Sequence, residues 1–205
     1  MPAIDIPPER KVLVTDFRVK YKDFFDLRKF YEDLHEWLRE HEFIDLEDET
    51  DHYEVLFLEK IDTAGFKEQW IRWRPQKIPK GSNYYRFWID FDYHNVGIGT
   101  AEIVKQGKKF KVNKGECELS VKVYMELDYK ELFKKSPVLK FFHRLFRERI
   151  FRKDLFEDHK REIYRESREM ENWVKHWFKL KRHLPYEEGE MFFEGHSWPT
   201  HRKDE

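Results

Sequence analysis

Two segments of the chain alternate apolar and polar side chains, and this pattern constrains the fold more than any other feature of the sequence. The apolar positions are Tyr85, Phe87, Ile89, Phe91 and Tyr93 in one segment, and Cys117, Leu119, Val121, Val123, Met125 and Leu127 in the other. Most positions between them carry polar or charged residues. Since successive side chains of a β-strand point to opposite faces, each segment predicts a strand with one dry and one wet face. Such strands are typical of antiparallel sheets.

The remaining patterns add further strands and helices. Strands are expected over residues 11–15, 53–61, 67–74, 84–94, 100–106 and 116–128, with turns between them that include Gly97-Ile98-Gly99. Apolar residues at steps of three and four predict a helix from an N-cap at Asp23 to about His41. Two more helices are expected over residues 136–151 and 154–182. We therefore predict an α+β fold, in which an antiparallel sheet of five to seven strands packs on a long C-terminal helix.

Chain length and residue usage bound the organisation of the protein. At 205 residues one hydrophobic core is expected, so residues 1–183 are predicted to form a single domain. Residues 184–205 carry six acidic and two basic side chains and are expected to form a flexible acidic tail. A single cysteine, Cys117, excludes a disulfide within the chain. No signal peptide or membrane span is recognisable, so the expected location is the cytoplasm.

Charged residues are unusually abundant and unevenly distributed. They make up 40% of the chain, against roughly 25% in ordinary globular proteins, while Asn and Gln together number only seven. This balance is typical of thermophilic proteins. Residues 1–66 contain 18 acidic and nine basic side chains, whereas residues 67–114 contain four acidic and 11 basic ones. Pairing of these charges within the fold is the favoured interpretation, and opposed surfaces that steer a partner are the alternative.

No catalytic or metal-binding motif is recognisable. Asp90, Asp92 and His94 lie with Arg86 on one face of a predicted strand, where acid–base chemistry or metal ligation is conceivable. A solvated outer face is the favoured interpretation, although a hidden enzyme would be sought there. Cys117 is expected to fill the core between two glutamates, which disfavours a reactive thiolate. No cofactor and no metal are predicted, and a non-enzymatic role is preferred.

A lysine-rich hairpin is the main candidate for contact with nucleic acid. Its basic residues are Lys105, Lys108, Lys109, Lys111 and Lys114. Lysines of this kind can contact phosphates, and Trp70, Trp73 and Trp88 could add stacking rings. Exposed hairpins are also commonly lysine-rich because charge protects edge strands from aggregation. Both interpretations remain open at this point.

The order of the expected elements resembles the helix-grip fold of START and Bet v 1-like proteins. It departs from that fold in having one helix, not two, after the first strand, and an extra helix before the long C-terminal one. The chain is also similar to archaeal proteins of unknown function, from Glu36-Trp37-Leu38 through Tyr164-Arg165. That similarity is clearest at Gln106-Gly107-Lys108-Lys109 and Arg147-Glu148-Arg149-Ile150-Phe151. The helix-grip resemblance implies an apolar ligand held between the sheet and the C-terminal helix.

Three functions are therefore considered. The first is a binding protein for an apolar small molecule, with a predicted lining of Phe87, Phe91, Val123, Met125, Met170, Trp173 and Trp177. The second is an RNA- or ribosome-associated protein that uses the lysine hairpin. The third is a structural or assembly protein whose C-terminal tail, rich in aromatic residues, docks on a partner or on a neighbouring copy.

Overall fold

One antiparallel sheet organises the part of the chain that the structure describes. The structure is a computed structural model, and it describes residues 6–8, 10–45, 47, 52–105, 108–131 and 155–180. The strands are β1 (Lys11–Phe25), β2 (Glu54–Ile61), β3 (Lys67–Trp73), β4 (Gln76–Lys77), β5 (Tyr85–Lys105) and β6 (Lys108–Leu127). They form a six-stranded sheet in the order β1-β6-β5-β3-β2, with β4 paired to β5. The predicted α+β class, antiparallel pairing and strand number are confirmed.

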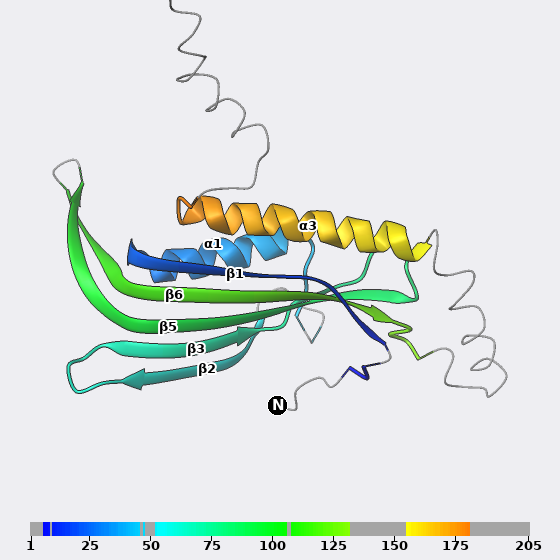
Figure 1. Cartoon of the computed structure of the whole chain (residues 1–205), viewed down its shortest axis with the longest axis horizontal. Coiled ribbons are helices and arrows are strands. Elements are labelled where there is room, and N and C mark those ends of the chain that lie inside the picture. Colours follow the sequence, from blue (N-terminus) through cyan, green and yellow to red (C-terminus); the bar gives the residue numbers. More distant parts are fainter. Residues whose placement is uncertain are drawn as a thin grey trace, which may run out of the picture.

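The two described helices lie on one face of this sheet (Figure 1). They are α1 (Leu27–Glu40) and α3 (Leu155–Trp177). The helix expected over residues 136–151 and the tail expected over residues 184–205 lie outside the described residues. No helix in the described part of the chain is long and apolar enough to cross a membrane.

The alternating pattern of β5 and β6 produces the dry face that the sequence predicts. Phe87 lies opposite Met125 and Phe91 lies opposite Val121 in the β5–β6 register, and all four side chains are fully buried. Residues directly opposite each other in an antiparallel pair point to the same face. These rows therefore cover the helix side of the sheet, while residues such as Asp92 point to the outer side.

The first helix begins three residues later than expected. Asp26, not Asp23, is the N-cap, and its carboxylate accepts a hydrogen bond from the backbone N–H of Lys29 at 3.0 Å. Asp23 instead belongs to β1, which continues to Phe25 because its pairing with β6 extends to Asn113. The Asn113 side chain then accepts a hydrogen bond from the backbone N–H of Leu27 at 3.2 Å. This contact ties the start of α1 to the sheet.

The segment Gly97-Ile98-Gly99 is not a turn, contrary to the prediction. It forms a bulge inside β5, where the pairing with β6 shifts between Val96 and Gly99. Gly97 has a φ of 63°, which favours glycine over residues with a side chain. A bulge bends the strand that contains it. Beyond this point β5 and β6 curl toward the helix side of the sheet (Figure 1).

Aromatic contacts join the end of α3 to α1. The ring of Phe30 lies 4.6 Å from that of Phe178 and 4.9 Å from that of Trp177, measured between centroids. The indole N–H of Trp177 donates a hydrogen bond to the Asp33 carboxylate at 2.8 Å. The helix ends at Trp177, earlier than the expected residue 182. Lys179 adopts a φ of 56°, and the next backbone N–H bonds back to a carbonyl of the last turn, as in a common helix C-cap.

The outer face of the sheet is covered by charged side chains paired across strands. Lys20 on β1 lies 2.6 Å from Glu116 on β6, and Arg18 lies 3.3 Å from Glu118. The Glu126 carboxylate, which is fully buried, binds the guanidinium groups of two arginines and the indole N–H of Trp88. Many charges of the described chain are thus paired inside the fold, in agreement with the favoured interpretation.

Candidate ligand-binding groove

The seven residues predicted to line a ligand cavity belong to the hydrophobic core. Five of them have no exposed surface: Phe87, Phe91, Val123, Met125 and Met170. The other two, Trp173 and Trp177, are partly buried and pack against the same cluster. The structure therefore brings these side chains together, but they contact one another and none of them lines the groove that is found further along the sheet.

This groove lies on the helix side of the sheet, beside the first turns of α1. Its volume is about 630 Å³. One wall is the start of α1, another is formed by β2 and β3 with the turn between them, and the end wall is the bent part of β5 and β6. The lining residues are Leu27, Arg28, Tyr31, Glu32, Glu54, Phe57, Gly65, Lys67, Gln69, Ile71, Ile98, Gly99, Thr100 and Asn113.

Glycines at the bulge allow the end wall to form. A Cβ atom on Gly115 would lie 2.7 Å from the Ile98 side chain and 2.9 Å from the backbone oxygen of Gly97. A Cβ atom on Gly99 would lie 2.9 Å from the ring of Phe66. Such distances are too short for van der Waals contact, so a side chain at position 115 would force the backbone apart. The close backbone approach at this bend therefore leaves no room for a side chain at position 115.

A hydrogen-bonded cluster occupies the junction of α1 with β2 and β3. The Tyr31 hydroxyl donates a hydrogen bond to the Glu54 carboxylate and accepts one from the Trp73 indole N–H at 2.8 Å. Burial, followed by the hydrogen bond to Glu54, raises the pKa of Tyr31 well above its ordinary value. Tyr31 therefore stays protonated at neutral pH and presents a fixed polar group to the groove.

Polar atoms without partners lie next to this lining. Gln69 lines the groove, and its side-chain oxygen accepts a hydrogen bond from the Asn95 amide at 3.3 Å. Asn95 is fully buried, yet its own side-chain oxygen has no hydrogen-bond partner among the described residues. The hydroxyl of Tyr93, two residues earlier on the same face, also lacks one. Two buried oxygens beside the groove can thus still form hydrogen bonds. A buried polar group without a partner lowers the stability of the fold, so a partner for either oxygen would be stabilising.

The charges at the groove are balanced. Arg28 and Lys67 supply two positive side chains, while Glu32 and Glu54 supply two negative ones. Arg28 lies 2.8 Å from Glu32, and Lys67 lies 3.0 Å from Glu59. The remaining lining is mainly apolar or uncharged. The groove thus suits a neutral molecule with an apolar body and a hydrogen-bonding end, because it offers little net attraction to an ion.

The predicted acid–base face lies on the outer side of the sheet, away from the groove. Arg74 contacts both carboxylates, at 3.2 Å from Asp90 and 2.7 Å from Asp92. His94 hydrogen-bonds to Glu68 at 3.0 Å and stacks on Trp70. Each group is thus held by a neighbour. Within the described ranges, no group of three or more His, Cys, Asp and Glu residues is arranged to hold a metal ion.

The lysine hairpin forms the far end of β5 and β6. Lys109, Lys111 and Lys114 are exposed there, although Lys109 lies 4.0 Å from Glu102. The side chains of Lys105 and Lys108 lie outside the described residues. Trp73 and Trp88 are only 1% and 3% exposed, and Trp70 stacks on a histidine. Of the three expected stacking rings, two are therefore buried and the third, Trp70, is half-buried against His94.

Cys117 is buried on the helix side of β6, as predicted. Burial raises the pKa of its thiol to about 12. The thiolate that nucleophilic chemistry requires is therefore scarce at neutral pH.

The groove residues were not identified from the sequence, because they come from three separate regions of the chain. The spacing of Gly97, Gly99 and Gly115 on either side of the hairpin was the available signal, since glycines inside strands mark bulges or close backbone approach. Comparison with known proteins adds no assignment: no family model, curated protein or solved structure matches the chain.

Proposed function

We propose that the protein is a non-enzymatic binding protein that holds a mainly apolar small molecule in the groove between α1 and the bent end of the sheet. The groove volume of about 630 Å³ carries this proposal, because ligand pockets span roughly 300–1,000 Å³ and are lined mainly by apolar groups with a few placed polar ones. Leu27, Phe57 and Ile71 supply the apolar surface. Tyr31 and Asn113 supply hydrogen-bonding groups.

The order of elements supports the same proposal. A strand, a helix, five further strands and a C-terminal helix succeed one another in the described chain. This order is similar to that of the helix-grip proteins, which have two helices after the first strand where this chain has one. Those proteins hold apolar ligands between the sheet and the C-terminal helix, which here would be α3. In this chain Met170 of α3 packs into the core. We therefore place the ligand nearer to α1, where the groove is open.

The neutral fluorescent dye Nile red tests this proposal. We expect saturable binding to the full chain, with an increase in fluorescence as the dye leaves water. Thr100 is exposed and lines the groove, so Thr100→Trp fills the space with an indole ring. This variant should bind the dye at least about tenfold more weakly, a change of roughly 1.4 kcal/mol, while its unfolding midpoint stays close to that of the parent.

Two control variants separate the groove from other apolar surface. Val96→Trp places the same ring on the outer face of β5, where Val96 is 37% exposed, and should bind like the parent. Leu58→Lys removes an exposed apolar side chain from the outer face of β2 and should also bind like the parent. Absence of saturable binding by the parent chain, or equal affinity in Thr100→Trp, would refute the proposal.

A further inference from the structure

The edge strand β2 exposes apolar side chains on both of its faces. It is the last strand of the sheet order, so no strand of the described chain pairs with its outer edge. Leu56 and Leu58 are 39% and 55% exposed, Phe57 is 50% exposed, and Ile61 near its end is 58% exposed. A long apolar edge of this kind is a template for pairing with another strand.

The opposite edge of the same sheet is protected. On its outer face β1 carries Asp16, Arg18, Lys20 and Lys22 at alternate positions, and these side chains pair with those of β6 or face solvent. Charge on an edge strand discourages pairing with other chains. Only Glu59 and Lys60 interrupt the apolar run within β2. Charged side chains thus protect the β1 edge of the sheet from pairing, whereas the β2 edge lacks this protection.

The sequence of β2 is complementary to itself when it is reversed. Leu56-Phe57-Leu58 reads the same in both directions, with a glutamate outside it on either side at positions 54 and 59. In an antiparallel pair centred on Phe57, Leu56 of one copy lies opposite Leu58 of the other. The charged residues add nothing to this match, because the register shift between Glu54 and Leu56 leaves Glu54 on the helix side, bonded to Tyr31, while Lys60 faces the outer side. The match is carried by the exposed leucines on the outer face.

We propose that this strand binds a second copy of the chain, with the two β2 strands paired antiparallel about a two-fold axis at Phe57. The pairing continues the sheet from one copy into the other and buries two leucines of each copy on the outer face. A two-fold contact between identical surfaces is the commonest form of protein association, and strand addition satisfies the free backbone groups of an edge. Phe57 also lines the groove, but the contact proposed here is made by the backbone edge of β2 and by Leu56 and Leu58 on the outer face, so it does not require a ligand in the groove.

Sedimentation of the full chain measures the association. We expect the parent to sediment at twice the mass of the chain at micromolar concentration, and Leu58→Lys to sediment as a monomer. Leu13→Lys is the matched control, because Leu13 is 51% exposed on the protected edge strand β1, and it should remain a dimer. Circular dichroism should give the same spectrum for all three proteins, which separates loss of pairing from loss of folding.

A cysteine at the centre of the pair tests the register. Residues directly opposite each other in an antiparallel pair have Cα atoms about 4.5–5.5 Å apart, which is within the range that a disulfide spans. Phe57→Cys should therefore form a covalent dimer on mild oxidation, and Leu13→Cys should not. The native Cys117 is buried, so it does not compete.

Three results would overturn the proposal. The first is a parent chain that is monomeric at all concentrations measured. The second is a dimer that persists in Leu58→Lys. The third is a Phe57→Cys variant that stays uncrosslinked while its mass is dimeric, which would exclude a two-fold axis at this residue.

Discussion

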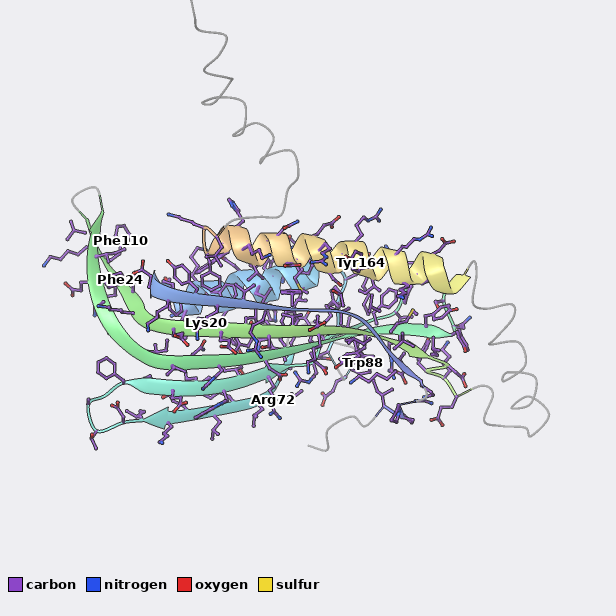
Figure 2. The ribbon with its side chains drawn as sticks, in the orientation of Figure 1. Lys20, Phe24, Arg72, Trp88, Phe110 and Tyr164 are labelled. Atoms are coloured by element: carbon purple, nitrogen blue, oxygen red, sulfur yellow. The ribbon has the colours of Figure 1, made fainter. Side chains whose placement is uncertain are left out.

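The same two strands, β5 and β6, serve different purposes in their two halves. In the half nearer to α3, alternate side chains such as Phe91 and Val121 are fully buried beneath the helices. In the half nearer to the hairpin, Val104 is 68% exposed and Phe110 is 47% exposed. Figure 2 shows Phe110 and Phe24 beyond the end of α3. The first half is a packed core, and the second forms the wall of an open groove.

The bulge at Gly97 and Ile98 separates these halves. Before it, the register keeps apolar residues directly under α1 and α3, so the interior is filled. After it, the strands extend past the end of α3, curl toward the helix side (Figure 1) and leave room beside the start of α1. The regular pairing of β5 with β6 thus places the core residues on one face, and the bulge in β5 makes room for the groove. If this view is right, substitutions on either side of the bulge should have different effects on stability and on binding.

The largest effect is expected in the packed half. Phe91→Ala removes a side chain with no exposed surface, in ring contact with Trp73. The lost burial and the cavity left behind should lower the free energy of unfolding by about 3–5 kcal/mol. Phe110→Ala removes the same side chain from the open half and should cost less than about 1 kcal/mol, since Phe110 is half exposed. Urea denaturation measures both, and equal losses would contradict the comparison.

A substitution at the bulge is expected to lower stability less than Phe91→Ala does, but to abolish binding in the groove. Gly115→Val places side-chain atoms against Ile98 and the backbone oxygen of Gly97. Crowding of this kind costs about 1–3 kcal/mol, and relief of the contact would move the end wall. Nile red binding should therefore be lost even where the variant remains folded. Lys114→Val, at the neighbouring exposed position, is the control and should retain both stability and binding. A folded Gly115→Val protein with unchanged binding would show that the groove does not depend on this bend.

The sequence predicts the packed half of the sheet well and the groove poorly. Alternation over residues 85–93 and 117–127 identifies the core strands, because burial on one face repeats every two residues. The groove has no such repeat, since Tyr31, Phe57 and Thr100 meet only after the sheet has formed. The ligand lining predicted from Phe87 and its neighbours fell within the core. Aromatic abundance indicates apolar burial and does not distinguish a filled interior from an open site.

The edge of the sheet illustrates a second limit. The sequence predicts a strand over residues 53–61, close to the observed β2. Its position at the edge follows from the order of strands in space, which local patterns do not specify. The sequence alone therefore does not show that the lysines of β1 protect one edge of the sheet or that the leucines of β2 lie at the other edge. Both conclusions require the strand order.

The last predicted effect concerns pH and again belongs to the packed half; it is absent at neutral pH and grows only above about pH 9. Burial raises the pKa of the Cys117 thiol from 9.0 to about 12. Because the folded state resists ionisation, the unfolded chain loses this proton at lower pH. Stability is then fully retained below about pH 9 and falls as the pH rises toward 12. The loss from this group should be about 1.4 kcal/mol for each pH unit. Burial also raises the pKa of Tyr93, which should add to the same slope at higher pH.

Urea denaturation between pH 8 and 10.5 measures this dependence. Cys117→Ala removes the titrating thiol, so the difference in unfolding free energy between this variant and the parent should shrink as the pH rises above 9. A difference that stays constant across this range would show that the thiol ionises as easily in the folded protein as in the unfolded chain. The packing around Cys117 would then be looser than the filled half of the sheet requires.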